Sequence, residues 1–161
     1  MSTPEERFAA LGLELPPPPK PMGVYKPALV EGVYLYVSGH GTMKPDGSMI
    51  TGKVGQELDA DAGKLAARQV GLSMIASIKA TVGSLDRIHR VVKVLGMVWA
   101  TPEFDRHPYV INGCSELFSA IWVATTRPKP ARRSSGKDTV LRPRSGRSVS
   151  PDSRTRMDAT G

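Results

Sequence analysis

The spacing of apolar residues predicts two amphipathic helices. Within residues 61–82, one apolar position recurs every four residues, at Ala66, Val70, Met74 and Ile78. Residues about four apart lie on the same face of an α-helix, so this stretch is expected to bury one side. Within residues 108–122 the apolar positions are i, i+4, i+7, i+8 and i+11, which are Val110, Cys114, Leu117, Phe118 and Ile121. This spacing predicts a second amphipathic helix.

Several other segments have the composition of β-strands. Residues 25–30 and 33–38 are rich in aromatic and β-branched residues, with Glu31-Gly32 as a candidate turn between them. Residues 49–54 are expected to return as a short edge strand. Residues 90–99 are apolar on both faces, which predicts a central strand. Strands and helices in this order indicate an α+β domain with two helices on one face of a sheet.

The N-terminal region predicts a short helix followed by an extended arm. Thr3-Pro4-Glu5-Glu6 places a capping residue, a proline and two acidic residues where a helix would begin. Four prolines at 16–19 and another at 21 then favour a stiff polyproline-type spacer. We therefore expect residues 1–22 to form an N-terminal helix and a proline-rich arm.

Charge divides the chain into a neutral body and a basic end. Residues 1–126 hold 12 Lys and Arg against 12 Asp and Glu, whereas residues 127–161 hold 10 against 3. The second part has few large apolar residues and no period of 2 or 3.6, so we expect a domain over 23–126 and a basic disordered tail over 127–161. One cysteine, no apolar run near 20 residues and no leader-like N-terminus favour a cytoplasmic protein without membrane contact.

The stretch Gly39-His40-Gly41, after the predicted strand over 33–38, is the first candidate site. Glycines there would let backbone N–H groups face an anion, because no Cβ blocks its approach; a plain β-turn is the alternative. His40 is either a turn residue or a proton-transfer group. Cys114 lies on the apolar stripe of the second predicted helix, where a core thiol and a nucleophile are the two alternatives.

Four motifs in order resemble the YjgF/RidA family of reactive-intermediate deaminases, also called endoribonuclease L-PSP. They are Gly32-Val-Tyr-Leu-Tyr-Val-Ser-Gly39, Thr51-Gly-Lys-Val-Gly55, Gly83-Ser-Leu-Asp-Arg-Ile88 with Val91-Val-Lys-Val94, and Val110-Ile-Asn-Gly113 with Glu116-Leu-Phe118. The resemblance implies a chorismate-mutase-like fold, a mixed sheet with two helices packed on one face. It also implies a homotrimer with clefts between subunits, and hydrolysis of enamines and imines of the 2-aminoacrylate type.

The resemblance also implies site residues. Tyr25 and Asn112 match catalytic positions, and Gly39 matches a backbone donor in the substrate-binding part. His40 stands beside it where the family commonly has Gln, and Cys114 lies close to Asn112 without a matching role; we expect both, with Gly39, to belong to the substrate-binding part. The implied substrate is a small molecule with a carboxylate, and no metal or cofactor is implied.

The chain departs from the family pattern after the second predicted helix. The family's Ala-Arg-Ser-x-Val-Gly segment, whose Arg clamps the carboxylate, and a last strand carrying a Glu are not found after Trp122. We therefore expect the last strand to be missing and the deaminase activity to be impaired. We hypothesise a frameshift near Val123. When the codons for residues 125–136 are read one base back, the genetic code permits a string of amino acids like the one that the family has there.

Two other functions are compatible with the sequence. Loss of the Arg and Glu favours a non-catalytic trimer that binds small metabolites. The basic tail would bind nucleic acid non-specifically, and its lack of aromatic residues argues against base recognition.

Overall fold

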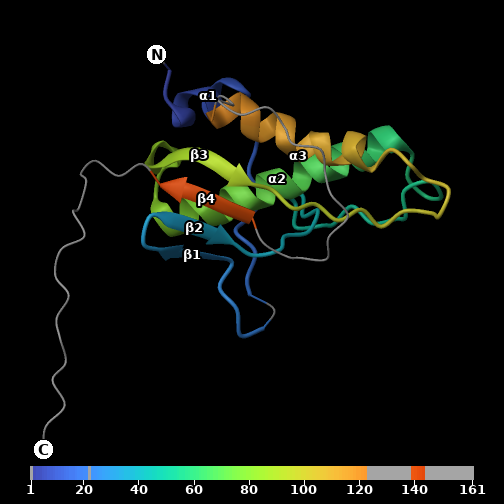
Figure 1. The fold of residues 1–161 in the computed structure, drawn as a ribbon, viewed down its shortest axis with the longest axis horizontal. Helices are drawn as coiled ribbons and strands as arrows, with labels where there is room; N and C mark the ends of the chain where they lie inside the picture. Colours follow the sequence, from blue (N-terminus) through green and yellow to red (C-terminus); the bar gives the residue numbers. More distant parts are fainter. Residues whose placement is uncertain (1, 22, 123–138, 144–161) are drawn as a thin grey trace, which may run out of the picture.

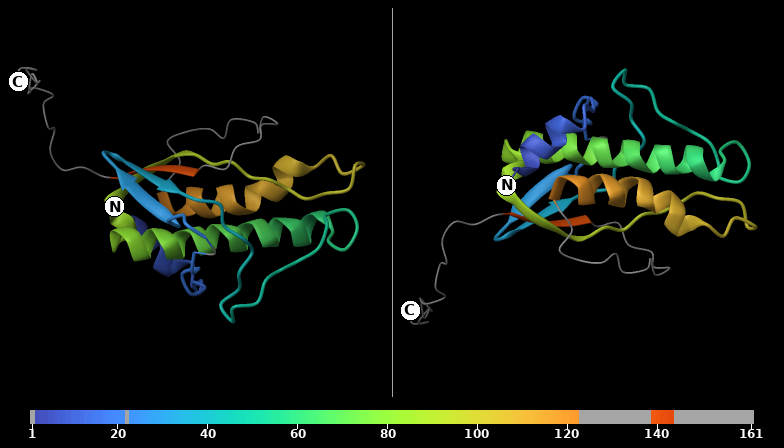
Figure 2. Two further views of the ribbon diagram at one scale, coloured as in Figure 1. Left: turned by 90° about the horizontal axis from the view of Figure 1, so that it is seen from below. Right: turned by 90° about the horizontal axis from the view of Figure 1, so that it is seen from above.

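The structure, a computed structural model, describes residues 2–21, 23–122 and 139–143. Its elements in chain order are α1 (Pro4–Ala10), β1 (Ala28–Glu31), β2 (Tyr34–Val37), α2 (Ala60–Val82), the 3₁₀ turn η1 (Leu85–Arg87), β3 (Ile88–Lys93), α3 (His107–Trp122) and β4 (Thr139–Pro143). Helices α2 and α3 run side by side against one face of the sheet (Figure 1 and Figure 2). The α+β fold with two helices on one face is therefore confirmed. None of the described helices is long and apolar enough to cross a membrane.

Helix α2 forms where the four-residue period predicted it. Its first turn is capped by Asp59, whose carboxylate accepts from the amide of Ala62 at 2.7 Å, and its end is set by Gly83 at φ 82°. Asp is a preferred N-cap, and a positive φ at the C-terminal end favours Gly. Ile75 and Ile78 are fully buried, so the face of α2 that carries them forms part of the hydrophobic core.

Helix α3 packs unusually close to α2 because glycine stands at the contact. A Cβ placed on Gly113 would lie 2.0 Å from the carbonyl oxygen of Lys64, and one on Gly71 would lie 3.0 Å from Leu117. Leu117 and Ile121 then reach the core with 1% and 0% exposure. The predicted apolar stripe of residues 108–122 is thus confirmed as the buried side of α3.

The hairpin β1–β2 begins the sheet. Glu31 pairs with Tyr34, so Gly32 and Val33 form the two-residue turn, and Gly32 supplies the positive φ of 56°. The turn is one residue later than the Glu31-Gly32 turn that the sequence suggested. Leu35 and Val37 point into the core at 0% and 2% exposure, while the tyrosines of β2 face outward.

The observed strands and their pairing correct three expectations. The order is β1-β2-β4-β3, with antiparallel pairing throughout, so the predicted mixed sheet is antiparallel in its four described strands. The segment 90–99 is not a central strand: β3 is an edge strand and ends at Lys93, and Trp99 is 71% exposed. Residues 49–54 form only isolated bridges, including Met43 to Met49.

The expectation that the last strand is missing is wrong. Strand β4 pairs with β2 on one side and with β3 on the other, with Leu141 opposite both Leu35 and Val91. Without β4 the facing N–H and C=O groups of β2 and β3 would have no ladder partner, which is costly for buried backbone. Five residues of the predicted tail are therefore part of the sheet, and the rest of residues 127–161 lies outside the described residues.

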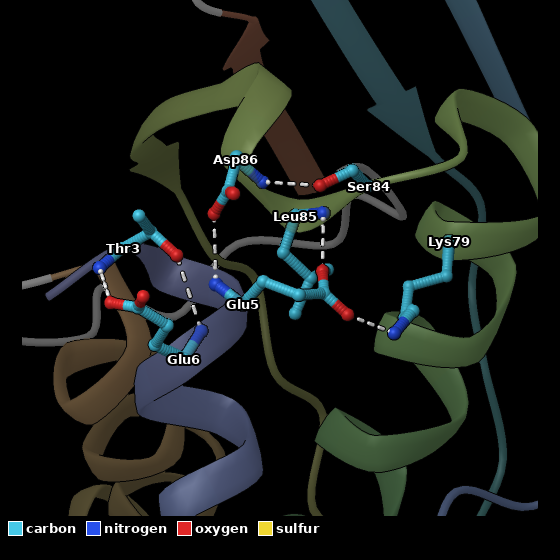
Figure 3. Close-up of polar contacts among 7 residues, drawn as sticks. All are labelled: Thr3, Glu5, Glu6, Lys79, Ser84, Leu85 and Asp86. Atoms are coloured by element: carbon cyan, nitrogen blue, oxygen red, sulfur yellow. Dashed lines mark hydrogen bonds and ion pairs between the residues drawn. The ribbon is translucent and has the colours of Figure 1, made fainter.

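A polar network fixes α1 to the end of α2 (Figure 3). Thr3 and Glu6 form a capping box, which confirms the helix start predicted there. Glu5 forms an ion pair with Lys79 and accepts from the amide of Leu85 at 2.9 Å. The Glu5 amide in turn donates to Asp86 at 2.9 Å. Burial raises the pKa of the Glu5 carboxyl, but the bonds that this carboxyl accepts from Lys79 and Leu85 outweigh the effect of burial and hold that pKa below its usual value.

Candidate functional site

A hollow of about 780 Å³ lies between the end of β2, helices α2 and α3, and the segment 94–99. Four of the five site residues predicted from the sequence line it, namely Tyr25, Gly39, His40 and Cys114. Its remaining lining is largely aliphatic, and none of its described lining residues is Lys, Arg, Asp or Glu. A hollow of this volume is within the range of small-molecule sites.

The polar groups of the hollow gather at the end of β2. Ser38 holds this turn against the start of β1, because its amide donates to Pro27 at 2.9 Å and its hydroxyl donates to Lys26 at 2.6 Å. A Cβ on Gly39 would meet nothing within 4 Å. The Gly39 amide and the Tyr25 hydroxyl have no hydrogen-bond partner among the described residues. These two donors are therefore available to a ligand.

His40 is a bridge between this turn and α2. Its Nδ1 lies 2.7 Å from the carbonyl oxygen of Ser38, and its Nε2 lies 2.7 Å from the hydroxyl of Ser77. A carbonyl oxygen only accepts, so Nδ1 carries the proton and neutral Nε2 accepts from Ser77. Burial lowers the pKa of His40, and the bond to Ser38 only partly offsets this. His40 is thus neutral at pH 7 with both ring nitrogens occupied.

Cys114 contributes an apolar wall to the hollow. The residue is 5% exposed, and burial raises the pKa of its thiol to about 12. The thiolate is the nucleophilic form, so this cysteine is unreactive near pH 7. Of the two alternatives left open by the sequence, the geometry favours the core thiol.

Asn112 does not line the hollow. It is exposed on α3, whereas Val110 and Cys114, two residues before and after it, both reach the hollow. Two residues correspond to about 200° of rotation around a helix, which turns Asn112 to the opposite side. Its predicted catalytic role stays a prediction that this hollow does not support.

Other features in and beside the hollow were not identified from the sequence. Ser77, which does not line the hollow but holds His40, lies on the buried face of α2 at 2% exposure, and Ser73 lies one turn before it at 1%. Two serines on an apolar helix face were a usable signal, because a buried hydroxyl requires a partner. Segment 94–99, a wall of the hollow, was mistaken for a strand because its apolar residues show no alternation.

These features define the protein as an α+β domain of the chorismate-mutase-like class with a largely apolar hollow beside the sheet. A family model described as "YjgF/chorismate mutase-like, putative endoribonuclease" matches residues 5–132. The chain belongs to this family. The match runs beyond residue 126, where we expected the domain to end, and the frameshift hypothesis stays a prediction.

Known relatives agree with this membership. Protein TCP17 of Trypanosoma cruzi is 35% identical over 112 residues, which cover 70% of each protein. A solved structure of the Agrobacterium tumefaciens protein Atu1372, of unknown function, is 30% identical with a TM-score of 0.72, covering 88% of this chain and 94% of that one. A structure titled a putative endoribonuclease from Shewanella oneidensis MR-1 is 27% identical with a TM-score of 0.73, covering 88% and 99%.

Proposed function

We propose that the protein hydrolyses enamine or imine intermediates of small carboxylates in the hollow. The observation that carries this proposal is that Tyr25 and Gly39, whose hydroxyl and amide have no hydrogen-bond partner among the described residues, both line a hollow that is otherwise largely aliphatic. Such an arrangement suits a small molecule with one polar end. The family membership supports the same class of site.

The chemistry requires a bound substrate and an oriented water. The Gly39 amide would donate to the substrate carboxylate, and the Tyr25 hydroxyl would orient the water that attacks the C=N carbon. An enamine first tautomerises to the imine by taking a proton at carbon and losing one from nitrogen. The water oxygen then forms the new C–O bond while the C=N electron pair moves to nitrogen, which takes one proton of the water. In the resulting carbinolamine the C–N bond breaks as the C=O bond forms, and the nitrogen leaves as ammonia with the second proton of the water, so that a 2-oxo acid remains. Orientation alone supports large accelerations of such a step. His40 and Cys114 take no covalent part, because one is fully hydrogen-bonded and the other is a neutral thiol.

We also propose that the protein works as a homotrimer. Large apolar residues are exposed on the sheet face away from the helices, with Tyr34 at 40% and Tyr36 at 42%, and beside the hollow, with Met97 and Trp99 at 71% each. Exposed apolar groups of this size in one molecule favour contact with another copy. Sedimentation-velocity ultracentrifugation is expected to show three chains per particle, and a monomer at micromolar concentration would contradict the proposal.

Binding without turnover is the second candidate. It is favoured by the absence of a free base, nucleophile or charged side chain among the described lining residues. Calorimetric binding of 2-oxobutanoate without any acceleration of imine hydrolysis would support it against the first proposal.

Cleavage of RNA is a weaker candidate for this site. A phosphodiester is anionic and is usually held by Lys or Arg, which the described lining lacks. The basic residues beyond residue 126 lie outside the described residues except Arg142, so nucleic-acid binding by the tail stays a prediction.

The test of the proposed function is a coupled assay. A serine dehydratase would generate 2-aminoacrylate, and release of pyruvate would be followed with and without the protein. The proposal predicts an acceleration that rises in proportion to protein concentration. No acceleration at any concentration up to that of the enamine would overturn it.

A further inference from the structure

We infer that the hollow takes a carboxylate ligand with an extended apolar chain, which lies along α2 away from the polar turn. This inference rests on the proposed function, since it names the substrate class of the same site. The observations behind it are the direction of the hollow, the chemistry of its far end and the absence of charge there.

The hollow runs along α2 from its polar end. His40 is bonded to Ser77, which fixes the polar turn near that part of the helix. The lining then continues along α2 through Met74, Val70 and Ala66 to Gly63. Met74 and Gly63 stand 11 positions apart on the helix, which corresponds to roughly 16 Å at a rise of 1.5 Å per residue. A three-carbon enamine would occupy only a small part of that length.

The far end of the hollow is aliphatic. Around Gly63 it is lined by Val54, Leu58, Val98 and Val110. The nearby backbone is already paired: the Val54 amide donates to Trp99 at 3.0 Å, and the Val54 carbonyl accepts from Thr101 at 2.9 Å. The wall therefore has few free polar groups at this end and suits methylene and methyl groups.

Charge at the far end of a ligand would be unfavourable. The described lining residues include no Lys, Arg, Asp or Glu, and a charge placed among aliphatic groups would lose its hydration without compensation. The site is thus expected to prefer monocarboxylates with a neutral chain over dicarboxylates.

The first test measures binding to the wild-type protein by calorimetry, using stable 2-oxo acids in place of the imines. The series is 2-oxobutanoate, 2-oxohexanoate and 2-oxooctanoate, with 2-oxopentanoate and 2-oxoglutarate as a pair of equal chain length. Burial of one CH₂ is worth about 0.8 kcal/mol, which corresponds to roughly a fourfold gain in affinity. We expect Kd to fall by about that factor per methylene, and 2-oxoglutarate to bind at least tenfold more weakly than 2-oxopentanoate. Equal Kd values along the series would overturn the inference.

The second test locates the chain in the hollow. Ala66→Phe would fill the far end and is expected to weaken 2-oxooctanoate at least tenfold while changing 2-oxobutanoate less than twofold. Ala80→Phe is the matched control, because Ala80 is an exposed residue of the same helix outside the lining. If Ala66→Phe does not fold, Ala66→Val is expected to produce the same selective loss to a smaller degree. Equal weakening of both ligands, or none, would overturn the placement.

The outcomes separate this inference from the proposed function. Length-dependent binding without imine hydrolysis would overturn the proposed function and leave the apolar site standing. Hydrolysis of short imines, together with ligand affinities that do not depend on chain length, would leave the proposed function standing and overturn the inference of a site for an extended apolar chain.

Discussion

The Nε2 atom of His40 lies 2.7 Å from the hydroxyl oxygen of Ser77, across 37 positions of sequence. This contact ties the turn after β2 to the middle of the core helix. It holds the neutral imidazole, because Nδ1 donates to the carbonyl of Ser38 and Nε2 accepts from Ser77. The turn that contains Gly39, a residue of the lining, is therefore fixed by a titratable group.

The His40 bridge predicts how stability changes with pH. The pKa of His40 is lowered in the folded protein, chiefly by burial, so between that pKa and the usual 6.5 the unfolded chain binds more protons. The stability that comes from keeping His40 neutral is fully present above pH 6.5. It is lost as the pH falls from 6.5 toward the lower pKa that His40 has in the folded protein. Urea unfolding at pH 7.5, 6 and 5 is expected to show a decline that His40→Gln reduces. An identical decline in that variant would contradict the assignment.

The ion pair of Glu5 predicts a second effect of pH on stability, at lower pH than the effect of His40. The pKa of Glu5 is lowered in the folded protein, so its contribution is complete above the usual value of 4.5 and is lost as pH falls below it. Because both partners are about one-third exposed, Glu5→Gln should cost only about 0.5–1 kcal/mol at pH 7. The difference from wild type should shrink at pH 3.5. Glu14→Gln, at an exposed position, is the control and should have little effect.

The helix contact at Gly113 predicts a large effect of one methyl group. Alanine is a better helix former than glycine by about 1 kcal/mol, but its Cβ would overlap the Lys64 carbonyl at 2.0 Å. We expect Gly113→Ala to lower the free energy of unfolding by about 2–3 kcal/mol, since the overlap is with backbone. Ser119→Ala, on the exposed side of α3, should change it by less than about 0.5 kcal/mol. A stabilised Gly113→Ala protein would contradict the close packing.

Strand β4 predicts a sharp boundary in truncation. A chain ending at Asp138 lacks the strand between β2 and β3, whereas a chain ending at Pro143 keeps it. We expect the shorter chain to lose cooperative unfolding or solubility, because two strands would expose unpaired backbone. The longer chain should unfold like the full protein. Equal behaviour of both truncated chains in circular-dichroism melts would contradict the role of β4.

The helices could be predicted from the sequence because their signals are local. The four-residue period from Ala66 to Ile78 lies within α2, and Asp59 as its N-cap and Gly83 as its C-cap stand directly beside it. The capping box at Thr3 is equally local. Each of these features depends on residues a few positions apart, which a periodicity argument can detect.

The features that escaped prediction depend on contacts distant in sequence. Thr139–Pro143 is a short apolar run in basic surroundings, and only its pairing with β2 and β3 makes it a strand. The bond of His40 to Ser77 and the exposed position of segment 94–99 likewise follow from tertiary packing. The candidate site was therefore only partly predictable: the polar turn and Cys114 were recognised, whereas the wall formed by segment 94–99 was not.

The most direct test of the site compares two tyrosine variants in the imine hydrolysis assay. Tyr25→Phe removes the hydroxyl of a residue that lines the hollow, whereas Tyr109→Phe removes one that donates to Asp61 outside it. Loss of a group that orients the attacking water should lower kcat/KM by about 10²-fold, while the free energy of unfolding stays the same. If the hollow is the site of hydrolysis, Tyr25→Phe is expected to show that loss and Tyr109→Phe to keep the wild-type kcat/KM. Equal kcat/KM for Tyr25→Phe and the wild-type protein would contradict it.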